Sequence, residues 1–136
     1  MQGSKEMGGE GVGLLVEFKN KFLLLKRKET GIWELCKGHL EIVECYEEAI
    51  KRELFEETGI ERSSSPKKIG ALTFSFISKK TNKIKTREIK YYHINVYTSN
   101  VILSDEHTDC LWLEKKFFLE KLAFEDVRNV MKHYFA

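Results

Sequence analysis

The sequence predicts a mixed α/β (α+β) fold in which a sheet and helices pack in layers. The expected elements follow one another as strand, strand, helix, strands and helices, and not as a regular alternation of strand and helix. The sequence also contains neither a GxGxxG dinucleotide fingerprint nor a GxxxxGK phosphate loop. These two observations together argue against a doubly wound parallel sheet.

Two apolar runs near the start of the chain predict a pair of strands. Residues 12–18 (VGLLVEF) and 21–27 (KFLLLKR) are separated only by Lys19 and Asn20, which is typical of a tight turn. A shorter apolar stretch, IWELCKGHL at 32–40, follows and includes a glycine.

A helix is expected over residues 44–58. Tyr46, Ile50 and Leu54 recur at every fourth position and form one apolar line. Gly59 follows directly, and glycine readily adopts the left-handed conformation in which many helices end. The remaining elements are strands at 68–78, 84–98 and 110–114, a turn at 79–83, and helices at 115–122 and 125–135.

The composition favours a single soluble domain over residues 1–136, with the glycine-rich residues 1–10 as a flexible lead-in. The net charge of +2 is too small to indicate a nucleic-acid or membrane-surface protein. No apolar stretch approaches the ~20 residues of a membrane helix, and the start does not look like a secretory signal. The three cysteines lack CxxC spacing, which argues against disulfides or zinc. A cytoplasmic protein without a membrane partner is therefore expected.

The first half of the expected helix is typical of a solvated surface. Glu47 and Glu48 precede Lys51 and Arg52 by four residues, which is the order of charges that favours ion pairs along a helix.

The second half of the helix places three acids together. Glu53 has Glu56 and Glu57 at i+3 and i+4, and only Glu56 has a base within reach, Arg52. Like charges at this spacing cost a few tenths of a kcal/mol, and the helix dipole disfavours anions at this end by about 0.3–1 kcal/mol. The cluster is either an acidic face in solvent or a site for a divalent cation, which would reverse both penalties. Such oxygen-rich sites suit Mg²⁺ or Mn²⁺ and indicate metal-assisted phosphate chemistry.

Residues 38–60 match the Nudix box, G-x5-E-x7-R-E-U-x-E-E-x-G-U with U a bulky aliphatic residue, at every defined position. The chain is therefore similar to the Nudix hydrolase family, and the order of elements around the box extends the resemblance over most of the chain. The matching positions are Gly38, Glu44, Arg52, Glu53, Leu54, Glu56, Glu57, Gly59 and Ile60.

The resemblance implies an α/β/α sandwich with a mixed sheet, and an enzyme that hydrolyses nucleoside diphosphates linked to another group. Water would attack one phosphorus of a phosphoanhydride whose phosphates are held by divalent metal. The resemblance also implies that Glu53 and Glu57 are direct metal ligands and that Glu56 is a further or outer-shell ligand. The carbonyl of Gly38 would complete the metal site.

The same resemblance implies roles for residues around the metal. Arg52 would orient the carboxylates, and Glu44 would pair with Arg52. The stretches WELCKGHLE and LSDEHTDCLWL are similar to those of the asymmetrical diadenosine tetraphosphate hydrolases of this family. On that match, Lys37 and His39 would flank the phosphate chain. Glu106 would supply a further carboxylate as a candidate general base.

Three positions depart from that branch of the family. Cys36 stands where a proline is usual, and Ile42 and Val43 replace the Pro-Gly that normally precedes the glutamate. The turn before the helix is therefore expected to be altered, although the expected metal ligands are all present.

Further substrate contacts are expected from aromatic and basic residues outside the box. Trp33 either stacks on a base or belongs to the core. Lys90 and Tyr92 are candidate contacts, and strand alternation places Tyr91 with Tyr97 on the face opposite Tyr92. The second strand pair has a basic side, which is either solvated or a funnel for a polyanion. Its members are Lys79, Lys80, Lys83, Lys85, Arg87 and Lys90.

Three functions follow as hypotheses. The first is hydrolysis of a small dinucleoside polyphosphate such as diadenosine tetraphosphate to ATP and AMP, by a monomer or a homodimer. The second is a pyrophosphohydrolase of nucleoside triphosphates or of the 5′ end of RNA, which the basic strand side would receive. The third is a nucleotide sensor without catalysis, and the intact acidic cluster argues against it.

Overall fold

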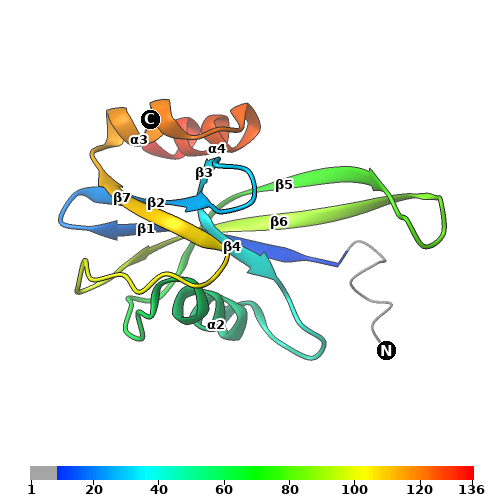
Figure 1. Cartoon of the computed structure of the whole chain (residues 1–136), viewed down its shortest axis with the longest axis horizontal. Coiled ribbons are helices and arrows are strands. Elements are labelled where there is room, and N and C mark those ends of the chain that lie inside the picture. The colour runs from blue at the N-terminus through cyan, green and yellow to red at the C-terminus, as the bar shows by residue number, and fades with distance from the viewer. Residues whose placement is uncertain (1–8) are drawn as a thin grey trace.

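The structure, a computed structural model, describes residues 9–136, so the expected flexible lead-in at 1–10 lies mostly outside the described residues. A seven-stranded mixed sheet lies between two helical layers, as Figure 1 shows. Helix α2 (Tyr46–Thr58) covers one face, and α3 (Lys115–Lys121) and α4 (Glu125–Phe135) cover the other. The expected mixed α+β fold with layered helices is confirmed. No helix among the described residues is long and apolar enough to cross a membrane.

The sheet combines antiparallel pairs with one parallel pair. Its main path runs β3-β2-β1-β6-β5, while β4 adds to β1 and β7 adds to β2. Among the strands of residues 9–136 only the β1–β6 pair is parallel, and it joins strands that are far apart in the sequence. The strands are β1 (Gly11–Phe18), β2 (Lys21–Arg27), β3 (Trp33–Glu34), β4 (Cys36–His39), β5 (Lys67–Ile77), β6 (Ile84–Asn95) and β7 (His107–Leu113).

The core has two parts because the central strands are buried on both faces. Along β1, Val12, Leu14 and Val16 pack in the cluster under α2. Leu15 points the other way, into the cluster that contains Phe118 of α3. This alternation explains why the first two strands read as continuous apolar runs and not as an apolar–polar pattern.

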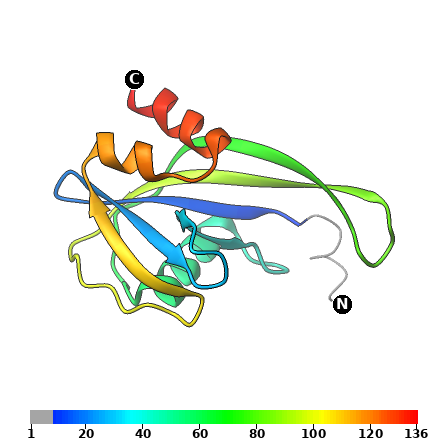
Figure 2. The same cartoon turned by 45° about the horizontal axis from the view of Figure 1, so that its top comes forward.

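The β5–β6 hairpin is long, and its far end extends beyond the rest of the sheet (Figures 1 and 2). Strand β6 ends at Asn95, where its parallel pairing with Glu17 of β1 also ends. Tyr97 therefore lies outside the strand and is 61% exposed, so the prediction that it shares a strand face with Tyr91 is wrong. Tyr91 and Tyr92 do lie on opposite faces of the sheet. Tyr91 belongs to the core cluster under α3 and α4, and Tyr92 packs against the cluster under α2.

Two other boundaries differ from expectation. The stretch at 32–40 divides into β3 and β4 because β3 pairs with β2 and β4 pairs with β1. Strand β7 begins at His107, three residues before the start that the sequence predicted at Cys110.

Helix α2 begins at Tyr46 and not at Glu44, with Cys45 as its N-cap. The Glu48 carboxylate accepts a hydrogen bond from the Cys45 backbone N–H at 2.9 Å. The predicted Glu48–Arg52 ion pair is therefore wrong, because Glu48 closes the first turn of the helix while Arg52 contacts other carboxylates. The predicted Glu47–Lys51 ion pair is also absent from α2, because the two side chains lie outside ion-pairing distance.

The loop between β4 and α2 is strained at Val43. This residue has a φ of 59°, which is rare for a β-branched side chain. The side chain is 99% exposed and so makes no packing contact that would compensate. Val43 thus holds a left-handed conformation that glycine would adopt at lower cost, and the expected alteration of the turn relative to that branch stays a prediction.

We expect Val43→Gly to raise the free energy of unfolding by about 0.5–2 kcal/mol, because glycine adopts this backbone without strain. Urea denaturation measures the change. Ile42→Gly is the matched control. Ile42 is also exposed but has no positive φ, so its replacement should destabilise the chain. A loss of stability in both variants would contradict strain at Val43.

Candidate active site

Six carboxylates from three separate segments meet around a cavity of about 760 Å³. The loop before α2, the second half of α2 and the loop before β7 all contribute to it. Strand β4 adds Gly38, and β6 adds Arg87 and Ile89. The carboxylates are Glu41, Glu53, Glu56, Glu57, Asp105 and Glu106.

The helix places two of these acids under β4 and one toward solvent. Glu53 and Glu57 are 8% and 6% exposed, whereas the Glu56 side chain is 54% exposed. The backbone N–H of Lys37 in β4 donates to Glu57 Oε1 at 3.1 Å. An acidic face in free contact with solvent is therefore the wrong description of Glu53 and Glu57.

The close approach of β4 to the helix requires glycine at position 38. A Cβ atom on Gly38 would lie 1.9 Å from the carboxyl carbon of Glu53. The box glycine is thus explained by contact with the box glutamate, because a side chain at this position would displace the Glu53 carboxylate.

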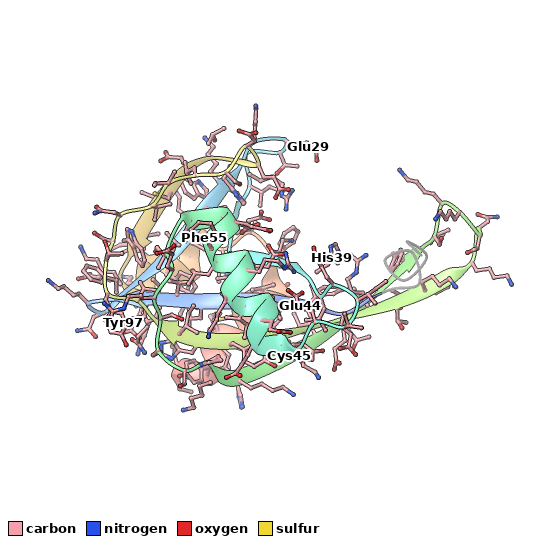
Figure 3. The ribbon with its side chains drawn as sticks, turned by 90° about the horizontal axis from the view of Figure 1, so that it is seen from below. Glu29, His39, Glu44, Cys45, Phe55 and Tyr97 are labelled. Atoms are coloured by element: carbon pink, nitrogen blue, oxygen red, sulfur yellow. The ribbon has the colours of Figure 1, made fainter. Side chains whose placement is uncertain are left out.

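Arg52 ties the acidic cluster together. Its Nε lies 2.7 Å from Glu44 Oε2, and one terminal nitrogen lies 2.8 Å from Glu53 and 3.2 Å from Glu56. The other terminal nitrogen donates to the His39 backbone carbonyl at 2.8 Å. Figure 3 shows Glu44 and His39 on the same side of α2. The prediction that Glu53 has no base within reach is wrong, because the long Arg52 side chain reaches both of these acids.

These surroundings change the charge behaviour of the acids in different ways. Burial raises the pKa of Glu57 to about 7, and it raises the pKa of Glu53 although Arg52 opposes the change. The hydrogen bond from Arg52 lowers the pKa of Glu44. Glu53 and Glu57 therefore resist ionisation in the absence of a cation, which marks them as candidate functional groups.

A third buried acid, Glu34, holds two basic residues of the cavity wall, Arg27 and Lys37. Its carboxylate contacts Arg27 at 3.0 Å, Lys37 at 3.6 Å and the buried His107 at 3.0 Å. These bonds outweigh burial and lower the pKa of Glu34. The sequence reasoning missed this group, and its only signal was an acid inside the apolar stretch 32–40.

The other predicted substrate contacts fall in different places. Lys37, His39 and Glu106 line the acidic cavity. Lys90 lies 4.3 Å from the centre of the Tyr46 ring, and Tyr92 packs against the same ring. Lys90 and Tyr92 lie on the α2 side of the sheet and do not line the acidic cavity.

A second cavity of about 450 Å³ adjoins the first and is largely apolar. Trp33 lines this second cavity and also packs against the core cluster that contains Phe118 of α3. Lys37, Arg87 and Ile89 line both cavities, so the two cavities adjoin at these residues. Arg87 was predicted only as part of the basic strand side, because its distance from the acidic helix depends on the parallel β1–β6 pairing.

The donor set suits a hard divalent cation. Among residues 9–136, no three acidic, histidine or cysteine side chains already form a closed metal cage. Magnesium does not need one, because it usually takes one or two carboxylates and completes its octahedron with water and substrate phosphates. The buried Glu53 and Glu57, with Glu56 on the rim, fit this requirement.

Comparisons with known proteins agree with this arrangement. Residues 9–134 match the family described as NUDIX domain. A MutT-like protein of Streptomyces ambofaciens is 42% identical over 48 residues, which is 35% of this chain and 31% of that protein. This chain thus matches less than a third of that relative's length.

Two solved structures share the fold over nearly their whole length. The MutT protein of Methanosarcina mazei Go1 has a TM-score of 0.76 at 26% identity, with 92% of this chain and 91% of that chain covered. An Ap4A hydrolase of C. elegans in a binary complex has a TM-score of 0.72 at 22% identity, with 93% and 94% covered. The chain therefore belongs to the NUDIX domain family.

Proposed function

We propose that this chain is a divalent-metal-dependent hydrolase of phosphoanhydride bonds, and that its substrate is a dinucleoside polyphosphate such as diadenosine tetraphosphate. The observation that carries the proposal is the pair of buried acids, Glu53 and Glu57, which line one cavity with the exposed Glu56. Buried like charges four residues apart are unfavourable for the fold, and a bound cation offsets that cost.

The residues around the cavity have different roles in the proposed reaction. A divalent cation held by Glu53, Glu56 and Glu57 supplies positive charge that offsets the charge of the phosphates. Arg52 keeps the Glu53 carboxylate in place, and the Lys37 N–H does the same for Glu57. Glu106 accepts a proton from the attacking water, which adds to phosphorus as the bond to the bridging oxygen breaks.

The position of Glu106 supports its role as the base. It precedes β7 directly, and its backbone is fixed at both polar groups. The Lys28 N–H donates to its carbonyl at 2.8 Å, and its own N–H donates to Ser104 Oγ at 3.3 Å. The Glu106 side chain lines the same cavity as the three glutamates of α2.

The two adjoining cavities support a substrate with a phosphate chain and an aromatic base. The acidic cavity suits the metal and the phosphates, and the apolar one suits a base. The local match to the asymmetrical diadenosine tetraphosphate hydrolases at Lys37, His39 and Glu106 favours a dinucleoside polyphosphate. The fold shared with the C. elegans Ap4A hydrolase is compatible with this substrate.

The second candidate is a pyrophosphohydrolase of nucleoside triphosphates or of RNA 5′ ends. The observation that favours it is the basic β5–β6 hairpin, whose far end extends beyond the rest of the sheet and carries lysines at 79, 80, 83 and 85. The likeness to MutT proteins agrees with either substrate.

A substrate panel tests the proposal. With magnesium, diadenosine tetraphosphate should give ATP and AMP, and EDTA should abolish the reaction until magnesium or manganese is restored. Hydrolysis in ¹⁸O-water, followed by mass spectrometry, identifies the phosphorus that is attacked. Two molecules of ADP, or rapid turnover of a triphosphate alone, would favour the second candidate. Full activity after rigorous chelation would contradict the metal site.

We expect Glu53→Gln to lower kcat by about 100-fold or more, because the charge that holds the cation is lost. The amide oxygen can still accept from Arg52, so the melting temperature should change little. Glu47→Gln is the matched control because Glu47 lies on the exposed first turn of the same helix. An unfolded Glu53→Gln variant, or one with normal kcat, would show that Glu53 is structural.

We also expect the stability of the metal-free chain to fall as the pH rises through about 7. The folded-state pKa of Glu57 is about 7, against an ordinary value of 4.5. Because the folded chain holds this proton more tightly than the unfolded chain, protonation of Glu57 stabilises the fold. This contribution is fully present below pH 4.5 and is lost as the pH rises through the folded-state pKa of about 7.

Glu57→Gln mimics the protonated acid and should not show this loss. Urea unfolding in EDTA from about pH 5 to pH 8 should therefore give a growing advantage to the variant. Added magnesium should restore the stability of the wild-type chain at the upper end of that pH range. An advantage that does not change with pH would contradict a buried, titrating Glu57.

A further inference from the structure

We propose that Arg87 binds a phosphate group of the substrate at the junction of the two cavities, and that the apolar cavity receives the base of the same nucleotide. The proposal depends on the proposed function only in that the ligand is a nucleotide. It does not depend on which bond is cut.

The hairpin places Arg87 between the two cavities. Arg87 lies on β6 opposite Phe74 of β5, and its guanidinium lies 5.1 Å from the centre of the Phe76 ring. Two residues further along the same strand, Ile89 also lines both cavities. The planar cation is therefore held against an aromatic wall at the place where the acidic and apolar spaces meet.

The other long basic side chains around the acidic cavity already contact carboxylates. Arg27 and Lys37 both contact Glu34, and Arg52 contacts Glu44 and Glu53. Their charges serve the fold and the acidic cluster, so they are less available to a ligand.

Arg87 has no such partner within the described part of the chain. No carboxylate there comes within ion-pairing distance, and the buried Nε atom has no hydrogen-bond partner. A buried donor without an acceptor costs free energy. An arginine fork matches the geometry of phosphate oxygens, so a bound phosphate would satisfy it.

The adjoining cavity has the size and chemistry for a base. Its volume of about 450 Å³ lies within the range of small-molecule sites. Trp33, Phe74 and Tyr91 bring aromatic surfaces to its wall, and such surfaces stack on nucleobases. A phosphate held at Arg87 would leave its nucleoside next to this wall.

Calorimetric titration tests the phosphate contact without turnover. The probe is an ATP analogue with methylene groups in place of both bridging oxygens, added with magnesium. We expect Arg87→Gln to weaken binding by roughly 10–100-fold, as loss of one charge-assisted contact does. Arg87→Lys should lose less affinity for the analogue because lysine keeps the positive charge. Adenosine, which has no phosphate, should bind equally to all variants.

Lys85→Gln is the matched control, since Lys85 is the next basic residue toward the tip of β6 and lines neither cavity. Its replacement should weaken binding by about twofold or less, the scale of a solvent-screened charge outside the cavities. Equal losses in the Lys85 and Arg87 variants would overturn the proposal in favour of a diffuse basic hairpin. Unchanged affinity in Arg87→Gln, or no binding by the wild-type chain at millimolar analogue, would also overturn it.

Fluorescence of Trp33 tests the position of the base. In a Trp112→Phe background, Trp33 is the remaining tryptophan of the sequence. Both the analogue and adenosine should quench it if the base enters the apolar cavity, and absence of quenching by a bound analogue would overturn this part. A chain that cleaves only triphosphates would leave all these outcomes unchanged. Failure of the proposed substrate is therefore distinguishable from failure of this proposal.

Discussion

Burial of two like charges beneath one strand is the constraint on which the rest of this site depends. Glu53 and Glu57 lie four residues apart on α2 and are almost completely covered. Burial without compensation would keep both carboxyl groups neutral. The structure compensates only in part, with the Arg52 guanidinium at Glu53 and the Lys37 N–H at Glu57. The remaining demand for positive charge is what makes the site suited to a cation.

Strand β4, which covers these two acids, makes contacts on two sides. It pairs with β1 through Gly38 and Lys37, and it also brings its backbone against the acids of α2. Because position 38 has no room for a Cβ, the strand can come close enough to bury Glu53. The connection from β4 back to α2 is then short, and Val43 is held in a left-handed conformation within it.

The sequence predicts the layers and the acidic cluster well, because these depend on local periodicity and on fixed spacing within one helix. It predicts charge partners poorly. On a helix, Arg52 can reach Glu48 or Glu56 equally well by spacing, and its tertiary contacts with Glu44 and the His39 carbonyl decide its orientation. For the same reason Glu34 was missed and Arg87 was predicted only as part of the basic strand side, since His107 beside Glu34 and the cavity beside Arg87 depend on strands that are distant in the sequence.

The charge balance of the cavity suggests the order in which its ligands enter. Six carboxylates line it, against the four long basic side chains of Arg27, Lys37, Arg52 and Arg87. Three of these bases are already engaged with acids, so carboxylates outnumber the free bases around the open space. A polyphosphate chain would be repelled from such a space. Cation binding therefore precedes or accompanies nucleotide binding, and nucleotide affinity and metal affinity should rise together because the coupling between two ligands is reciprocal.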